Sequence, residues 1–173
     1  MNARGKVVHV ALIGKSCSGK TSASNLLAQR LRDHGVRATV VAEGASAAMR
    51  NGFGDIPVLV GTQSVRVQAA IGAAMYHAGA AAERLLLAAG GGVAIHDRGV
   101  FDAVAYSSTE AVECELETAG TTLLSVAREF SRVYALEAGA YETESNPFRY
   151  EGEVRAEAAG AAVRRARRHQ VAV

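Results

Sequence analysis

Eight consecutive residues, Gly14 to Thr21, have the types and spacing of a loop that binds phosphate. They read Gly-Lys-Ser-Cys-Ser-Gly-Lys-Thr and fit the pattern G-x-x-x-x-G-K-[ST], with an apolar run before them and a helical pattern after them. Gly14 and Gly19 allow the backbone to fold around an anion, so that successive N–H groups point at it. The N-terminus of the following helix adds its positive dipole end. The sequence therefore predicts that this loop binds a nucleoside triphosphate.

The residues expected to contact the triphosphate are Gly14, Lys15, Ser16, Cys17, Ser18, Gly19, Lys20 and Thr21. Lys20 is expected to reach the β- and γ-phosphates, and the Thr21 hydroxyl to hold Mg²⁺. Asp97 ends an apolar strand, at the edge of a parallel sheet where ligands bind, and is a second candidate for holding Mg²⁺. An aspartate in that place also serves as a turn former or helix cap. We expect ATP and Mg²⁺, although such a loop does not read the base.

The residues that follow Asp97 extend the pattern. Asp97-Arg98-Gly99 continues through Phe101-Asp102-Ala103-Val104-Ala105-Tyr106, which resembles the Asp-Arg element of P-loop nucleoside and nucleotide kinases. It is more similar to the Asp-Arg-Gly-x-x-Asp-x-x-Ala-Tyr segment of the small AAA-type ATPase/kinase family that includes nicotinamide-riboside kinase modules. The similarity covers roughly residues 7–166, and the phosphate-binding loop and the Asp-Arg-Gly segment are its specific parts.

This resemblance implies an ATP-dependent kinase that phosphorylates a hydroxyl of a nucleoside-like or other small-molecule acceptor. Glu43 ends the second strand, where these families place an acidic residue that faces the acceptor. Gln68, on the long helix before the Asp-Arg strand, resembles the family's substrate-binding Gln, and Arg149 resembles the Arg of a late lid-like loop. Tyr106 is a further candidate for the acceptor pocket, although an aromatic residue at helical spacing also fits the core.

Two roles stay open at this point. Arg98 could contact the acceptor or a transferring phosphate, or it could form a salt bridge with Asp102 or Glu43. Glu43 is a candidate general base, because a partly desolvated carboxylate at a strand end can accept a proton as the hydroxyl attacks. Asp97 could act as the base instead, with Glu43 holding a substrate hydroxyl.

The main alternative function is a regulatory NTPase or nucleotide-binding switch that acts through a protein partner. Such a protein needs a residue that positions water and switch loops that the γ-phosphate orders. The sequence has no Asn-Lys-x-Asp element of the kind that selects guanine, which argues against a GTPase. A degenerate loop with a structural role is disfavoured by the intact Lys20, Thr21 and Asp97.

Composition favours one globular domain over residues 1–173. Apolar residues make up 49% of the chain and its net charge is +2, which is ordinary for a globular protein. Cys17 and Cys114 are too few for a disulfide framework or a zinc site, and with nucleotide use they favour a cytoplasmic protein. The Ala-rich stretch 69–89 is too weakly apolar for a bilayer span, although it could pack against a second copy as a homodimer. The terminal arginines lack interleaved aromatic residues, so nucleic acid is not expected as a partner.

Periodicity and turn residues predict an alternation of strands and helices. Strands are expected over residues 6–13, 37–43, 93–97 and 132–136, and helices over 20–34, 62–89, 101–107 and 121–130. Residues 44–61 read as a loop with one helical turn, and 110–118 fit neither pattern. A lid-like loop and a C-terminal helix are expected over 139–170. The fold class is a three-layer α/β P-loop NTPase fold with a parallel sheet of about five strands, the last truncated.

Overall fold

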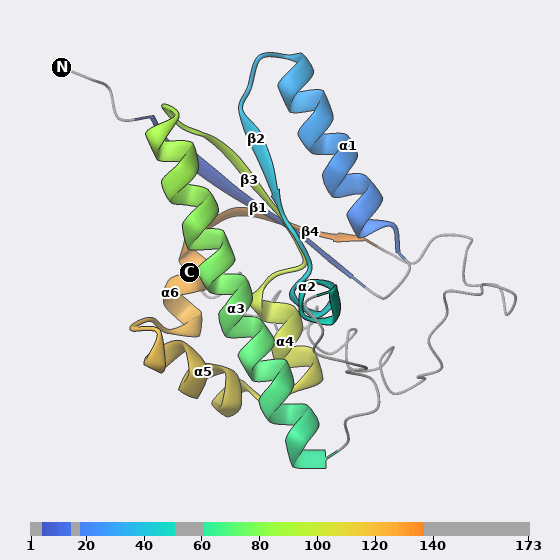
Figure 1. Ribbon diagram of the computed structural model, residues 1–173, viewed down its shortest axis with the longest axis vertical. Coiled ribbons are helices and arrows are strands. Elements are labelled where there is room, and N and C mark those ends of the chain that lie inside the picture. Colours follow the sequence, from blue (N-terminus) through green and yellow to red (C-terminus); the bar gives the residue numbers. More distant parts are fainter. Residues whose placement is uncertain (1–4, 15–17, 51–60, 137–173) are drawn as a thin grey trace, which may run out of the picture.

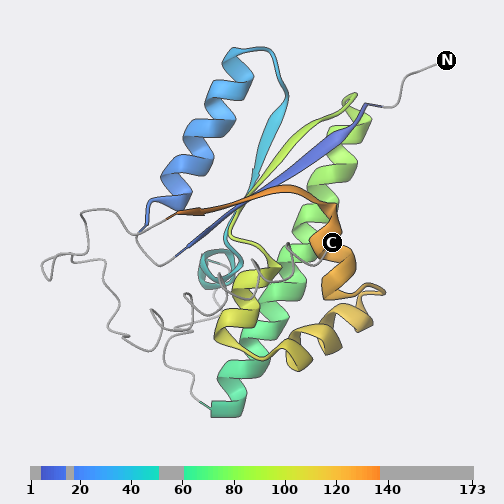
Figure 2. The ribbon, with the colours of Figure 1, turned by 180° about the vertical axis from the view of Figure 1, so that it is seen from behind.

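The computed structural model describes residues 5–14, 18–50 and 61–136, which form a parallel sheet with helices on both faces (Figures 1 and 2). The elements in chain order are β1 (Val7–Gly14), α1 (Lys20–Asp33), β2 (Ala38–Val41), α2 (Gly44–Arg50), α3 (Gly61–Ala88), β3 (Gly92–Asp97), α4 (Val100–Tyr106), α5 (Thr109–Thr118), α6 (Leu123–Glu129) and β4 (Phe130–Leu136). This is the α/β P-loop NTPase fold that the sequence predicts.

The four described strands lie in the order β2-β3-β1-β4, and every pairing between them is parallel. The register places Leu12 of β1 opposite Asp97 of β3, so the phosphate-binding loop and the Asp97 carboxylate leave the sheet at the same edge. Val41 of β2 lies opposite His96, which brings the segment after β2 to that edge as well. Parallel topology thus gathers the predicted site from three separate strands.

Alternation along β3 divides the core between the two faces of the sheet. Ile95 is buried with Leu12 and with Ala28 of α1, so this face of the sheet is covered by α1. The next residue, His96, lies against α3, where a Cβ built on Gly79 would come within 2.8 Å of its Cε1. The long helix α3 therefore covers the other face (Figure 1).

Close packing of helices holds α4, and with it the residues after β3, in place. A Cβ built on Gly72 of α3 would lie only 2.7 Å from the Cβ of Ala103 on α4, so the absence of a side chain at Gly72 lets the two helices approach. Ala69, Val100 and Ala103 belong to one buried cluster. The same cluster includes buried residues of α5 and α6, so these two helices also pack against the core that holds α4.

A pair of buried histidines lies between the sheet and α3. His9 Nδ1 and His96 Nε2 are 3.1 Å apart, and both side chains are buried. Burial lowers the pKa of His9, against an opposing effect of Glu83, whose Oε1 lies 4.0 Å from His9 Nε2. Burial, together with His9, also lowers the pKa of His96 to about 3. The two rings are therefore neutral at pH 7 and share a hydrogen bond.

The observed elements follow the predicted ones with differences in two segments. The helical turn expected within 44–61 extends over seven residues as α2, where Gly44 packs closely against Met75 and Ile71 of α3. The unplaced stretch 110–118 is the helix α5, which begins at an N-cap where the Ser108 side chain accepts from the Ala111 N–H. The fifth strand, the lid-like segment 139–170 and Arg149 lie outside the described residues. Within the described ranges no helix has the length and apolarity needed to cross a membrane.

Candidate functional site

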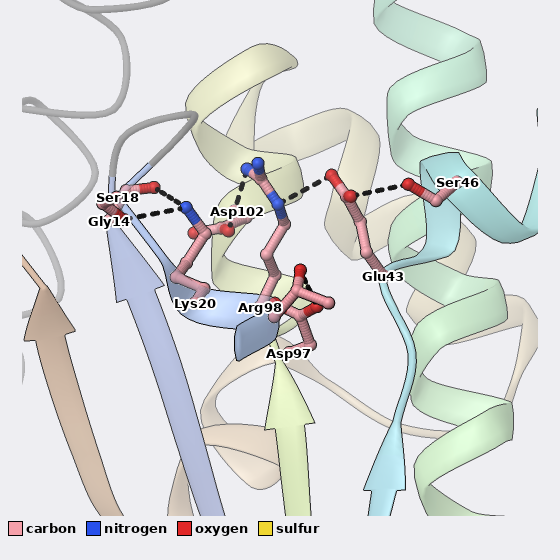
Figure 3. A network of polar contacts seen from close by, with 9 residues as sticks. Gly14, Ser18, Lys20, Glu43, Ser46, Asp97, Arg98 and Asp102 are labelled. Atoms are coloured by element: carbon pink, nitrogen blue, oxygen red, sulfur yellow. Dashed lines mark hydrogen bonds and ion pairs between the residues drawn. The ribbon is translucent and has the colours of Figure 1, made fainter. Parts of the chain in front are cut away.

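Gly14 and Ser18 of the phosphate-binding loop contact the side chain of Lys20. Gly19 adopts the left-handed conformation, with φ 82°, immediately before α1 begins at Lys20. Lys20 Nζ donates to the Gly14 carbonyl oxygen at 2.9 Å and to Ser18 Oγ at 3.2 Å (Figure 3). Burial is the largest cause that lowers the pKa of Lys20, to about 8, and the charge of Arg98 acts in the same direction. This ammonium lies in a place where an anion would stabilise its charged form.

Thr21 and Asp97 provide oxygen atoms that can act as metal ligands. Thr21 Oγ1 donates to Asp97 Oδ2 at 2.6 Å, which joins the first turn of α1 to the end of β3. Asp97 Oδ1 is buried and has no hydrogen-bond partner among the described residues. A buried carboxylate oxygen without a donor is well suited to a cation or its bound water.

These two residues fit the magnesium ion that the phosphate-binding loop implies. Mg²⁺ takes oxygen ligands and usually keeps several waters, with one or two protein groups and the substrate phosphates completing its shell. A hydroxyl and a carboxylate with an unpartnered oxygen match that requirement. The described residues include no group of three or more His, Cys, Asp or Glu residues that could hold a metal ion by themselves. The donor set therefore favours a metal bound together with phosphates.

Arg98 follows Asp97 and contacts a different set of residues. It is the one non-glycine residue with positive φ in the described ranges, at φ 72°, and its N–H donates to the Leu12 carbonyl at 3.0 Å. Its Nε lies 2.7 Å from Glu43 Oε1 and its Nη1 lies 3.4 Å from Asp102 Oδ2 (Figure 3). Only 13% of the Arg98 side chain is exposed. Such strain in a non-glycine residue persists where surrounding contacts over-determine it.

Glu43 and Asp102 hold the guanidinium from two directions. The second oxygen of Glu43, Oε2, accepts a 2.7 Å hydrogen bond from Ser46 Oγ at the start of α2. Asp102 lies in the first turn of α4. Burial raises the pKa of Asp102 to about 6, although the charges of Arg98 and Lys20 act to lower it. The site thus places a carboxyl group with a near-neutral pKa beside two cations.

The structure brings most of the predicted site residues together at one edge of the sheet. The predicted residues that meet there are Gly14, Ser18, Gly19, Lys20, Thr21, Glu43, Asp97, Arg98 and Tyr106, the last through a side-chain hydrogen bond to Arg98. For Arg98, the sequence left open a contact with the acceptor or a transferring phosphate and a salt bridge with Asp102 or Glu43. The structure has salt bridges with both carboxylates, and the substrate contact stays a prediction.

Other predicted residues lie elsewhere. Gln68 is half-buried on α3 and takes no part in the described network of hydrogen bonds and ion pairs. Lys15, Ser16, Cys17 and Arg149 lie outside the described residues.

Ser46 and the full part played by Asp102 were missed by the sequence reasoning. Asp102 stands four residues after Arg98, a spacing at which oppositely charged side chains meet on a helix face. That spacing was the available signal for Asp102. Ser46 stands three residues after Glu43, but the stretch around it has no clear period, so nothing in the sequence paired the two.

The match to a protein-family model agrees with the fold. The sequence matches the AAA_28 family model, described as an AAA domain, over residues 9–171. Among solved structures, a cysteine-to-alanine mutant of the Mycobacterium tuberculosis APS kinase CysC is similar, with 19% sequence identity and a TM-score of 0.41. That match covers 95% of this chain and 98% of the other chain. A search of curated proteins found no match.

Proposed function

We propose, from the premise that the chain belongs to this family of AAA domains, that it is a small-molecule kinase. It transfers the γ-phosphoryl group of ATP, with Mg²⁺, to a hydroxyl of a nucleoside-like or other small acceptor. The family and the loop support the nucleotide half of this proposal. The acceptor half rests on the residues around Arg98.

The observation that carries the proposal is the charged cluster of Arg98, Glu43 and Asp102 beside Lys20 (Figure 3). A site that only binds and hydrolyses a triphosphate needs the loop, a metal ligand and a positioned water. Here a mostly buried guanidinium is held by two carboxylates, Glu43 in the segment after β2 and Asp102 on α4. Such fixed polar groups suit the recognition of a second substrate.

On the nucleotide side, each residue of the chain has a defined part in the proposal. Lys20 exchanges its contacts with Gly14 and Ser18 for phosphate oxygens and offsets the charge that develops on them. Thr21 and Asp97 hold the metal-bearing end of the triphosphate through their oxygen atoms. Mg²⁺, when bound, supplies charge neutralisation between the β- and γ-phosphates.

On the acceptor side, Arg98 orients the acceptor or a phosphate oxygen with its planar donors. Glu43 keeps that guanidinium in place, and Ser46 keeps Glu43 in place. Tyr106 borders the same group through its hydrogen bond to Arg98. Arg149, in the predicted lid, remains a proposed partner of the transferring phosphate. Positioning and fixed charges provide most of the acceleration in such a transfer.

The proposal is tested with labelled ATP, Mg²⁺ and a panel of nucleosides and other small hydroxyl compounds. The wild-type chain should label at least one acceptor, and Lys20→Ala should abolish the labelling. The exposed Lys6→Ala provides a matched control that should transfer at the wild-type rate. Steady ATP hydrolysis with no labelled acceptor, increased by a protein partner, would support the regulatory NTPase instead.

A further inference from the structure

We infer that Asp102 accepts the proton of the acceptor hydroxyl as that oxygen attacks the γ-phosphorus. The inference rests on the proposed kinase function and adds the identity of its general base. Within the described ranges, three carboxylates lie at this edge of the sheet, those of Glu43, Asp97 and Asp102. Their contacts distinguish the three.

Glu43 has both oxygens engaged at short distance. Oε1 lies 2.7 Å from Arg98 Nε, and Oε2 accepts from Ser46 Oγ at 2.7 Å. A base needs a lone pair that faces the proton it takes, within about 3 Å. Proton uptake by Glu43 would also break its charge-assisted bond with Arg98, which costs more than an ordinary hydrogen bond. Glu43 is therefore a positioning residue for Arg98.

Asp97 has a separate role on the nucleotide side of the proposed site. Its Oδ2 accepts the 2.6 Å hydrogen bond from Thr21, and its Oδ1 is enclosed without a partner among the described residues. That enclosed oxygen suits a cation and its water on the nucleotide side. Protonation of Asp97 would weaken the same binding, so this carboxylate serves best when it stays ionised throughout the reaction.

Asp102 faces the place where transfer occurs. It lies between Lys20 and Arg98 (Figure 3), and its ion pair with Arg98 Nη1, at 3.4 Å, is longer than the 2.7 Å ion pair between Arg98 and Glu43. Lys20 in such loops reaches the β- and γ-phosphates, so a carboxylate beside Lys20 lies next to the γ-phosphoryl group. The Asp102 side chain is 13% exposed, so it is not fully enclosed by the described residues.

The acidity of Asp102 suits a base that works near neutral pH. Burial raises its pKa to about 6, with Arg98 and Lys20 acting to lower the pKa and Glu43 acting to raise it. Those three are the charged groups that face Asp102 from the turn after β3, from α1 and from the end of β2. The carboxyl is ionised at pH 7 to 8, and its conjugate acid is weak enough to hold a proton through the reaction.

The proposed step is a displacement at the γ-phosphorus. The acceptor oxygen forms a bond to the γ-phosphorus, while the bond from that phosphorus to the β,γ-bridging oxygen breaks and ADP leaves with the electron pair. The proton of the hydroxyl passes to a carboxylate oxygen of Asp102, which becomes a carboxylic acid and later returns the proton to solvent. No oxidant or reductant takes part.

The test measures kcat/KM for the labelled acceptor between pH 5 and 9 at saturating Mg²⁺ and ATP. The wild-type rate should fall tenfold per pH unit below about pH 6, because protonated Asp102 cannot accept a proton. Asp102→Asn should lose about 10²–10⁴-fold in kcat and show no such decline. Glu43→Gln should keep the decline, moved to slightly lower pH. Asp33→Asn, on the far end of α1, is the control and should match the wild type.

Each outcome bears on the inference. If Asp102→Asn keeps both the acid decline and a rate within threefold of wild type, Asp102 only positions Arg98 and the inference is wrong. Loss of the decline in Glu43→Gln would also overturn it. If Asp102→Asn does not fold, Asp102→Glu decides: its decline should move in pH, and an unmoved decline assigns the base elsewhere. A wild-type chain that binds ATP but labels no acceptor would overturn the proposed function, and this inference with it.

Discussion

The Thr21 hydroxyl donates a 2.6 Å hydrogen bond to Asp97, across 76 positions of sequence, and so ties the start of α1 to the end of β3. Asp97→Asn keeps an oxygen that can accept this bond but removes the negative charge. We expect the affinity for Mg²⁺ and ATP together to fall about tenfold or more, because ligand charge determines how strongly a cation is held. Titration of a fluorescent ATP analogue with and without Mg²⁺ checks this. An affinity that depends on Mg²⁺ as strongly as in the wild type would remove Asp97 from the metal site.

Arg98 combines a strained backbone with two ion pairs, and two variants separate these features. Arg98→Lys cannot span Glu43 and Asp102 with one planar group, so we expect transfer to fall at least about tenfold. Arg98→Gly removes the charge but relieves the left-handed conformation at φ 72°, which favours the glycine backbone by about 1 kcal/mol. The melting temperatures of Arg98→Lys and Arg98→Gly should therefore differ less than their transfer rates do. Arg30→Lys, exposed on α1, is the control.

Ser46 holds the oxygen of Glu43 that faces away from Arg98. Ser46→Ala removes a hydrogen bond worth about 1 kcal/mol, so we expect KM for the acceptor to rise about fivefold. The affinity for ATP should not change, because Ser46 bonds to Glu43 and Glu43 bonds to Arg98, on the acceptor side of the proposed site. Ser131→Ala, exposed on β4, should leave both constants at wild-type values. A change in ATP affinity alone would place Ser46 on the nucleotide side.

The buried pair of His9 and His96 predicts a loss of stability in acid. Both folded-state pKa values are lowered below 6.5, so the unfolded chain binds protons that the folded chain does not. Stability should therefore fall as pH falls below about 6.5, by at most about 1.4 kcal/mol per pH unit for each ring.

His9→Asn tests this sign, because the Asn amide can replace Nδ1 in the bond to His96 without titrating. Its melting temperature should depend less on pH, between 7 and 5, than that of the wild type. His77→Asn alters an exposed ring and should keep the wild-type dependence. Equal slopes in all three proteins would show that His9 contributes no proton linkage.

The contact between Gly72 and Ala103 predicts a compensating pair of substitutions. Gly72→Ala puts a methyl group within 2.7 Å of the Ala103 Cβ, and should cost about 1–3 kcal/mol of unfolding free energy. Ala103→Gly in the same chain restores the space. The double variant should then be more stable than the sum of the two single changes, as urea unfolding measures. Strict additivity would mean that α3 and α4 do not pack as closely as the structure shows.

The sequence was sufficient for the sheet and for the nucleotide half of the site. Apolar runs predicted β1 and β3 to within a residue or two, and the loop between β1 and α1 has a pattern that chemistry restricts tightly. Because parallel strands end at one edge, the sequence alone predicts Asp97 beside Thr21, where the structure has it.

The arrangement of residues around Arg98, on the acceptor side of the candidate site, depends on tertiary packing. That Arg98 bonds to both Glu43 and Asp102 follows from the left-handed turn at Arg98 and from the way α3 holds α4, and neither has a local signal in the sequence. Ser46, which holds Glu43, lies on α2, and the Ala and Gly residues of this helix show no clear period in the sequence. The helix is stabilised by its packing against α3. Roles for Gln68 and Arg149 stay predictions.

The adjacency of Asp97 and Arg98 has a consequence for how this segment can vary. Asp97 accepts from Thr21 of α1, and its neighbour Arg98 pairs with Glu43 after β2 and with Asp102 of α4, so adjacent codons specify contacts with different elements. Deleting Asp97 would place Arg98 next to Thr21, and inserting a residue before Asp97 would place its carboxylate where Arg98 meets Glu43 and Asp102. The site therefore depends on the adjacency of these two residues as well as on their identities.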